Sequence, residues 1–390
     1  MTSTVSGNLV IGQAGGATAV VNASLVGAFL TASEEQGIGG IYGMRFGIEG
    51  LLKDDLIDLR RQPADIWPRL LDTPSAALGS THHHLTDDDL EHIMHNLRHH
   101  QVRYLLYIGG NGSAITVHRL AQLTSQQHYD LSAISVPKTI DNDLPHTDHC
   151  PGYGSGARFI ALTTMHSTMN MLSVPQGDPL KVIETVGRNA GWLAAASALG
   201  KRHEDDAPHL ILTPEHPFQD ESFLEQVESI YHRLGYVVIV AAEALHDAQG
   251  QPLGPTEQDK TNSTAQYLGK ILKQRLRMDA RFDKPGDLQW SSTSRVDRDE
   301  AYLVGQQGVR ALLNAENDKM VTLVRRDTPT YSCTTSLVDL AMVVNKQRFF
   351  PDEYLDARKT MVTQAFYDYA LPLLGDPLPD YPKLVLIKVQ

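Results

Sequence analysis

Short apolar runs alternate with longer helical patterns along most of this 390-residue chain, and this alternation constrains the fold more than any other feature. Apolar runs between turn residues predict buried strands, and apolar residues at helical spacing predict the helices that connect them. Strands that alternate with helices form βαβ units. We therefore expect an α/β protein with doubly wound, mostly parallel sheets. The expected strands are residues 8–12, 104–109, 132–136, 182–185, 209–212 and 237–242.

The length and the turn signals divide this expected fold into two α/β domains. The chain is too long for one ordinary core, and a turn-rich stretch at residues 151–156 is the best boundary. We expect one domain over residues 1–150, to which part of 286–328 returns, and a second over 151–285. Residues 329–390 are expected to form a mainly helical C-terminal segment, because strand signals fade there.

The charge of the chain narrows its classes of partner. Lys and Arg number 34 against 46 for Asp and Glu, which gives a formal net charge of −12. An acidic surface argues against non-specific binding to nucleic acid or to anionic membranes. Two cysteines, Cys150 and Cys333, make no disulfide framework, and no window has the roughly 18 apolar residues of a membrane span. We expect a cytoplasmic protein with no nucleic-acid or membrane partner.

Two glycine-rich loops follow expected strands. Glycine lets backbone N–H groups approach an anion at a helix N-terminus, which favours phosphate binding. An ordinary turn, in which glycine only relieves backbone strain, explains either loop on its own. Two such loops in one doubly wound chain favour a phosphate site. The loops are Gly15-Gly16 and Gly109-Gly110-Asn111-Gly112-Ser113.

Two carboxylates and a lysine directly follow the strand expected at 132–136. In phosphoryl transfer, one carboxylate can take the proton of the attacking hydroxyl and the other can hold Mg²⁺, while a lysine neutralises the transferred group. A polar turn with a helix cap is the simpler interpretation, and composition alone does not exclude it. The segment reads Pro137-Lys138-Thr139-Ile140-Asp141-Asn142-Asp143.

At this segment the chain resembles a known family. Residues 135–158, SVPKTIDNDLPHTDHCPGYGSGAR, are similar to the catalytic signature of phosphofructokinases, especially the short bacterial pyrophosphate-dependent type. The resemblance implies Mg²⁺-dependent transfer of a phosphoryl group from pyrophosphate or ATP to the 1-hydroxyl of fructose 6-phosphate. It also implies a glycolytic enzyme that assembles as a homodimer or homotetramer. Further similar segments follow in the family's order at 109–113, 184–192, 242–243, Gln289 and 297–308.

The resemblance assigns roles to individual residues. It implies that Asp141 activates the sugar hydroxyl, with Lys138 and Thr139 beside the transferred group. Asp143 corresponds to a magnesium ligand, and Asn111 can offer a further, weaker oxygen to the metal. The residues implied at the phosphoryl-donor site are Gly15, Gly16, Gly110, Gly112, Ser113 and His82. Those implied at the acceptor are Asp143, Gly187, Arg188, Glu243 and Arg281, the last often across a subunit contact.

Three positions depart from the family pattern by losing fixed positive charge. His82 and His84 stand where the family usually has an arginine and, in pyrophosphate users, a lysine. Histidine is largely neutral at pH 7, and losing one charge-stabilising donor costs on the order of 10²-fold in rate. Trp290 stands where an arginine commonly binds the sugar 6-phosphate, and an indole cannot pair bidentately with phosphate.

The phosphoryl donor and the exact activity stay open from the sequence. Gly112 leaves room for the α-phosphate of a nucleotide, which favours ATP, whereas Lys138 replaces a glycine of many ATP users, which favours pyrophosphate. An active phosphofructokinase is the first interpretation, supported by the intact Asp141. A family member for another sugar or polyol phosphate is the second, because of Trp290. A non-catalytic or regulatory paralogue is the third, because of His82 and the altered loops.

Overall fold

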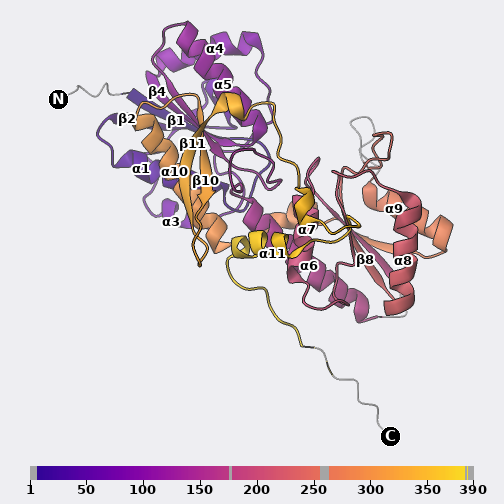
Figure 1. Ribbon diagram of the computed structural model, residues 1–390. Coiled ribbons are helices and arrows are strands. Elements are labelled where there is room, and N and C mark those ends of the chain that lie inside the picture. Colours follow the sequence, from indigo (N-terminus) through magenta and orange to yellow (C-terminus); the bar gives the residue numbers. More distant parts are fainter. Residues whose placement is uncertain (1–6, 175–177, 255–262, 383, 385–390) are drawn as a thin grey trace.

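The computed structural model describes residues 7–174, 178–254, 263–382 and 384, and Figure 1 shows that they form two lobes. The first lobe contains a seven-stranded sheet with strand order β11-β10-β5-β4-β1-β2-β3. Its strands pair in parallel except for the antiparallel pairs β2–β3 and β10–β11. They are β1 Gly7–Gln13, β2 Ile38–Met44, β3 Leu56–Asp58, β4 Val102–Gly109, β5 Ser132–Pro137, β10 Lys319–Arg325 and β11 Cys333–Asp339.

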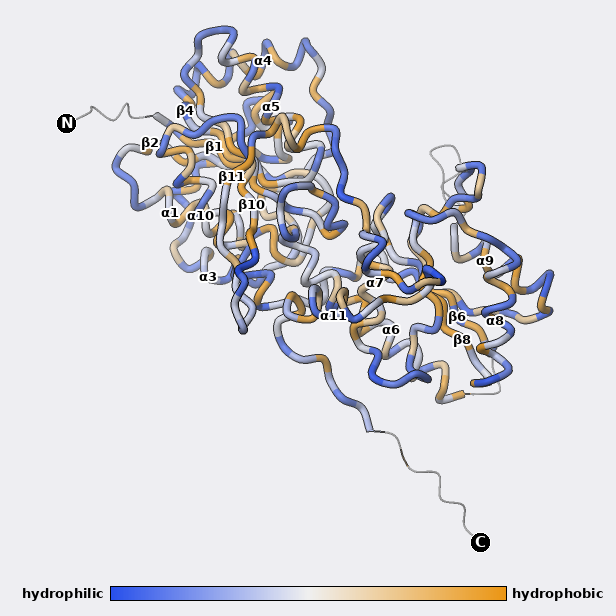
Figure 2. Tube along the Cα trace, viewed as in Figure 1, coloured by the Kyte–Doolittle hydropathy of each residue, from blue (hydrophilic) through white to orange (hydrophobic). Residues whose placement is uncertain are grey.

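The second lobe contains a four-stranded sheet with order β7-β8-β6-β9, in which every pair is parallel. All six residues of β8, Val-Val-Ile-Val-Ala-Ala, are buried, as expected for a parallel strand covered by helices on both faces. Figure 2 shows these hydrophobic strands inside a hydrophilic exterior. The two mostly parallel sheets confirm the expected α/β class. The strands are β6 Leu180–Thr185, β7 Leu210–Leu212, β8 Val237–Ala242 and β9 Ala280–Asp283.

Eleven α-helices of the described residues connect and cover the strands. Local signals set several ends: Thr86 and Asp89 form a capping box at the start of α4, and Gly235, with φ 80°, ends α8. The helices are α1 Val21–Ser33, α2 Ile48–Leu52, α3 Ile66–Leu70, α4 Asp87–His99, α5 Asn111–Gln126, α6 Tyr153–Leu172, α7 Trp192–Ala196, α8 Asp220–Leu234, α9 Thr264–Leu276, α10 Arg295–Leu313 and α11 Gln364–Ala370.

Helix α10 returns the chain from the second lobe to the first. It packs against α1 so closely that a Cβ at Gly27 would lie 2.2 Å from the carbonyl oxygen of Tyr302. A Cβ at Gly305 would lie 2.1 Å from that of Ser24, so glycine is required on both helices. Strand β10 then joins β5 in the larger sheet. The domain boundaries proposed above stay a prediction.

The expectation of a mainly helical C-terminal segment is wrong. Strand β11 falls within it, and the part from 340 to 382 contains only α11 and short 3₁₀ helices at Leu340–Met342, Asp352–Tyr354 and Leu371–Leu374. Its apolar side chains, Phe350 and Phe366 among them, pack into one core with Trp192 instead. The fading of strand signals therefore does not indicate helix here, because tertiary packing decides the conformation of this segment. No helix in the described ranges is both long and apolar enough to span a bilayer.

Candidate active site

A cavity of about 600 Å³ lies where the carboxyl ends of strands from both sheets meet. Loops after β1, β4 and β5 form one side of it, and loops after β6 and β8 form the other. Ligands of parallel α/β sheets bind at this edge. The predicted site residues that line it are Gly15, Gly16, His82, Gly110, Asn111, Gly112, Ser113, Lys138, Thr139, Asp141, Asp143, Gly187, Arg188 and Glu243.

Arg281 does not line this cavity. It lies on β9, where its Nε donates to Asp178 Oδ2 at 3.2 Å. Its proposed action across a subunit contact stays a prediction.

Lys138 joins the two glycine loops. Only 2% of the residue is exposed, its Nζ donates to the carbonyl oxygen of Gly16 at 2.5 Å, and its backbone N–H donates to that of Gly109. Gly15 has φ 75°, which favours glycine, and brings the loop beside the ammonium group. Burial lowers the pKa of Lys138 to about 8, although the nearby Asp141 opposes that shift. Lys138 therefore places a buried positive charge between the two glycine loops.

Asp141 has the properties of a general base. Burial raises its pKa to about 7, and the carboxylates of Asp143 and Glu243 add to that increase. The backbone N–H of Asp141 donates to Thr139 Oγ1 at 3.1 Å, which orders the turn. A base whose pKa lies near the working pH takes and releases protons most effectively.

Asn111 and Asp143 offer oxygen atoms to a divalent cation. Asn111 is the first residue of α5, and its Nδ2 donates to Asp143 Oδ2 at 2.8 Å. Its Oδ1 is buried without a hydrogen-bond partner, and burial raises the pKa of Asp143. Hard cations such as Mg²⁺ prefer carboxylate and amide oxygens. The pair therefore fits the expected magnesium site.

The C-terminal segment holds the loop that carries these carboxylates, which the sequence did not reveal. The backbone N–H of Arg348 donates to the carbonyl oxygen of Asp143 at 2.7 Å. Asn142, with φ 55°, donates through Nδ2 to the Tyr369 hydroxyl and accepts from the backbone N–H of Cys150. Arg348 also donates to Tyr369 at 2.9 Å. No local signal could identify Arg348 or Tyr369, because both lie more than 200 residues after Asn142 and Asp143 in the sequence.

Asp297 fixes the start of α6 next to the same loop. This buried carboxylate accepts from the backbone N–H groups of Gly152 at 2.8 Å and Ser155 at 2.9 Å. Carboxylates are favoured at a helix N-terminus, where backbone N–H groups lack partners. The sequence placed Asp297 within a family-like segment but assigned it no role.

The second lobe supplies the opposite end of the cavity. The backbone N–H of Arg188 donates to Glu243 Oε1 at 3.0 Å, and positive φ angles at Gly187 and Arg188 shape the turn. Gln289 and Trp290 complete this wall. Gln289 Oε1 and Trp290 Nε1 are both buried without hydrogen-bond partners. Such atoms are rare in folded proteins and suit a polar ligand group.

The fold and the site together define an α/β phosphotransferase, with glycine loops, a buried lysine and paired carboxylates in one interlobe cavity. Residues 8–312 match the family described as Phosphofructokinase. The chain belongs to the phosphofructokinase family, whose members are phosphotransferases that act on sugar phosphates.

Comparisons with individual relatives agree with this family assignment. The chain is 35% identical to the pyrophosphate–fructose 6-phosphate 1-phosphotransferase of Rhodospirillum rubrum, and the match covers 96% of each chain. It is 30% identical to a sulfofructose kinase of Alkalicoccus urumqiensis, over 90% of this chain and 92% of the relative. The crystal structure of a pyrophosphate-dependent phosphofructokinase from Nitrosospira multiformis superposes with a TM-score of 0.88 at 32% identity, covering 97% of this chain and 94% of that one.

Proposed function

We propose that this protein is a pyrophosphate-dependent 6-phosphofructokinase, which transfers a phosphoryl group to the 1-hydroxyl of fructose 6-phosphate with the help of Mg²⁺. The observation that carries the proposal is the buried Lys138 ammonium against the donor loop at Gly16, close to Asp141. A relative named for the same reaction is 35% identical over nearly the full length. The cytoplasmic setting and the homo-oligomer expected from the resemblance stay predictions.

In this proposal the residues divide the work of one in-line displacement. Asp141 accepts the proton of the 1-hydroxyl as that oxygen attacks the nearer phosphorus of pyrophosphate. The bond to the second phosphoryl group breaks, and orthophosphate leaves. Lys138 and the backbone N–H groups of the glycine loops stabilise the charge on the transferred group. Asp143 and Asn111 would hold Mg²⁺, which would supply positive charge to the phosphate oxygens.

Lys138 favours pyrophosphate over ATP as the phosphoryl donor. A Cβ placed at Gly112 would meet nothing within 4 Å, so this position borders open space that admits a nucleotide but does not require one. A buried lysine, in contrast, is costly unless it meets an anion. We therefore give more weight to Lys138 than to Gly112.

The test is the formation of fructose 1,6-bisphosphate from fructose 6-phosphate and Mg²⁺, with pyrophosphate and ATP supplied separately. We expect product with pyrophosphate and at least about tenfold less with ATP. Robust product with ATP alone would refute the donor assignment. No product with either donor, from a folded sample that still binds pyrophosphate, would favour a regulatory paralogue.

A second candidate is phosphoryl transfer to another anionic fructose derivative. Trp290 places a buried, unpaired indole nitrogen in the cavity wall, where the family commonly has an arginine. One relative at 30% identity is named sulfofructose kinase. Turnover of 6-deoxy-6-sulfofructose, compared with fructose 6-phosphate under the same donor, separates the two candidates.

A further inference from the structure

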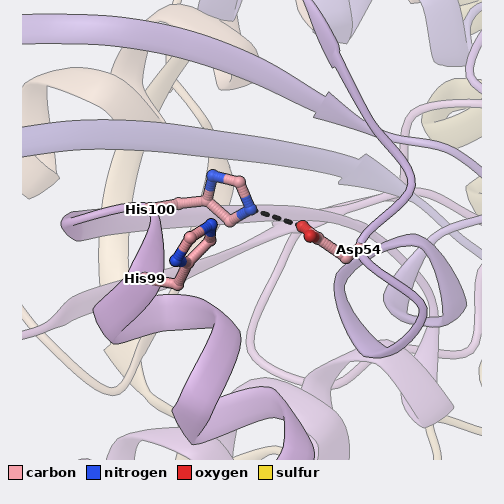
Figure 3. A group of neighbouring side chains, drawn as sticks. All are labelled: Asp54, His99 and His100. Carbon is pink, nitrogen blue, oxygen red and sulfur yellow. Dashed lines mark hydrogen bonds and ion pairs between the residues drawn. The ribbon is translucent and has the colours of Figure 1, made fainter.

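Two histidines and an aspartate gather at the C-terminal end of α4. His99 is the last residue of this helix, His100 follows it as the C-cap, and Asp54 lies in the turn between α2 and β3. One ligand atom from each residue lies within 4.8 Å of the other two. Figure 3 shows the His100 ring facing Asp54, with the His99 ring directly beside it.

The protein already holds these side chains together. His100 Nε2 is hydrogen-bonded to Asp54 Oδ1. The rings of His99 and His100 meet edge to face, with their centroids 4.8 Å apart. Asn96 Nδ2 donates to the carbonyl oxygen of Leu51 at 2.8 Å, which fixes α2 against α4. An ion that engages all three residues would take the place of the hydrogen bond between His100 and Asp54.

Two imidazoles and one carboxylate, with room for water as a fourth ligand, are the donor set of an open zinc site. Magnesium and calcium prefer oxygen ligands alone, so the two imidazoles select a softer cation. Asp54 and His99 are exposed, so an ion can enter and leave from solvent. From this cluster we propose that Asp54, His99 and His100 bind an exchangeable Zn²⁺ ion.

This site is separate from the cavity between the lobes. Strand β4 begins at Val102, two residues after His100, so the cluster lies at the amino end of the strand. The cavity lies at the opposite, carboxyl end, after Gly109. The zinc proposal therefore does not depend on the proposed phosphotransferase reaction.

Zinc at this position would link α2 and α4, the two helices that hold the cavity loop containing Thr81 and His83. Glu49 Oε1, on α2, accepts a hydrogen bond from the Thr81 hydroxyl at 2.5 Å. Asp89, in the first turn of α4, lies 2.9 Å from His83 Nε2. Thr81 and His83 both belong to the loop that lines the cavity. Tying the turn at Asp54 to the end of α4 therefore stabilises the two supports of this loop against each other.

The test is titration of the EDTA-treated, dialysed full chain with ZnCl₂, followed by calorimetry and by thermal unfolding. The variants are His99→Ala and Asp54→Asn, and the matched control is His92→Ala with His232→Ala, two exposed helical histidines outside the cluster. We expect the wild type and the control to bind one more Zn²⁺ than either variant, or to bind it at least about tenfold more tightly. Zinc should raise their melting temperatures, and EDTA should reverse the effect.

His99 makes ring contacts with His95 and His100 at the helix surface, so its replacement leaves the core intact. Circular dichroism of each zinc-free variant checks the fold, and Asp54→Asn preserves the side-chain shape. Equal zinc stoichiometry and affinity in the wild type and both variants would overturn the proposal. Loss of binding in the control as well would also overturn it, since that result points to scattered surface histidines.

Discussion

His149 Nε2 lies 2.7 Å from Glu300 Oε2, and His149 Nδ1 lies 2.8 Å from Asp148 Oδ2. One buried imidazole thus joins the loop that follows Asp143 to helix α10. Burial acts to lower the pKa of His149, but the two carboxylates outweigh it and raise the pKa to about 9. The ring is therefore charged at neutral pH. It compensates the half-buried carboxylate of Asp148 and the buried carboxylate of Glu300.

Replacing His149 by glutamine should destabilise the fold. The variant loses the charge that compensates Glu300 and that shares Asp148 with Arg325, so we expect a loss of about 3–5 kcal/mol in the free energy of unfolding near pH 6. Urea unfolding measures it, and His232→Gln, an exposed site, is the control.

The same residue predicts a pH dependence of stability. The folded pKa of His149 is raised above the ordinary 6.5, so its contribution is complete below that value and is lost as pH rises toward 9. The gap between the wild type and His149→Gln should therefore narrow between pH 6.5 and 9. A gap that stays constant over this range would contradict the charged state of His149.

Removing the proposed base should slow the chemistry and leave binding intact. For Asp141→Asn we expect kcat to fall by about 10²–10⁴-fold, because the amide cannot accept the hydroxyl proton. Calorimetric affinity for pyrophosphate should change little. Steady-state kinetics decide the matter, with Asp130→Asn, an exposed carboxylate, as the control. Wild-type kcat in Asp141→Asn would rule out this residue as the base.

The lowered pKa of Lys138 predicts how the reaction rate depends on pH above neutrality. Its pKa is lowered to about 8, so the charged form and the rate with pyrophosphate should fall as pH rises through 8. Lys138→Arg keeps its charge at all these pH values, and the decline should disappear even if the rate is lower. Rates measured from pH 6.5 to 9.5 test this, and a decline that persists in the variant would assign it to another group.

A carboxylate at position 111 should strengthen the metal site. In Asn111→Asp the hydrogen bond to Asp143 becomes a repulsion between two carboxylates, which Mg²⁺ relieves. We expect a lower melting temperature without Mg²⁺ and roughly tenfold tighter activation by Mg²⁺. Asn111→Ala, which removes both amide atoms, should weaken activation instead. Similar Mg²⁺ dependence in all three proteins would exclude Asn111 from the metal site.

Trp290→Arg should improve recognition of a phosphorylated acceptor. A guanidinium can pair bidentately with phosphate, so we expect KM for fructose 6-phosphate to fall by about tenfold. Leu288→Arg, an exposed position on the same 3₁₀ helix, controls for added charge. An unchanged KM would place the acceptor's phosphate elsewhere, with Arg281 of a second subunit as the next candidate.

The sequence by itself determined the α/β class, most central strands and the loops at their ends. Apolar runs such as residues 237–242 predict buried strands from local pattern alone, and they lie as strands in the structure. The sequence also determined that the residues from Lys138 to Asp143 lie together in one loop, because consecutive residues stay close in any fold. Family-like motifs then placed Glu243 and Arg188 on the other side of one cavity.

Only the tertiary structure decided which distant residues support that cavity. Arg348 and Tyr369 reach the loop at Asn142 and Asp143 from the C-terminal segment. We expected this segment to be mainly helical, but its side chains fill a core around Trp192. The zinc cluster likewise unites Asp54 with histidines 45 residues or more away. Local sequence sets backbone preference, whereas such contacts depend on how separate elements pack, so no short-range pattern encodes them.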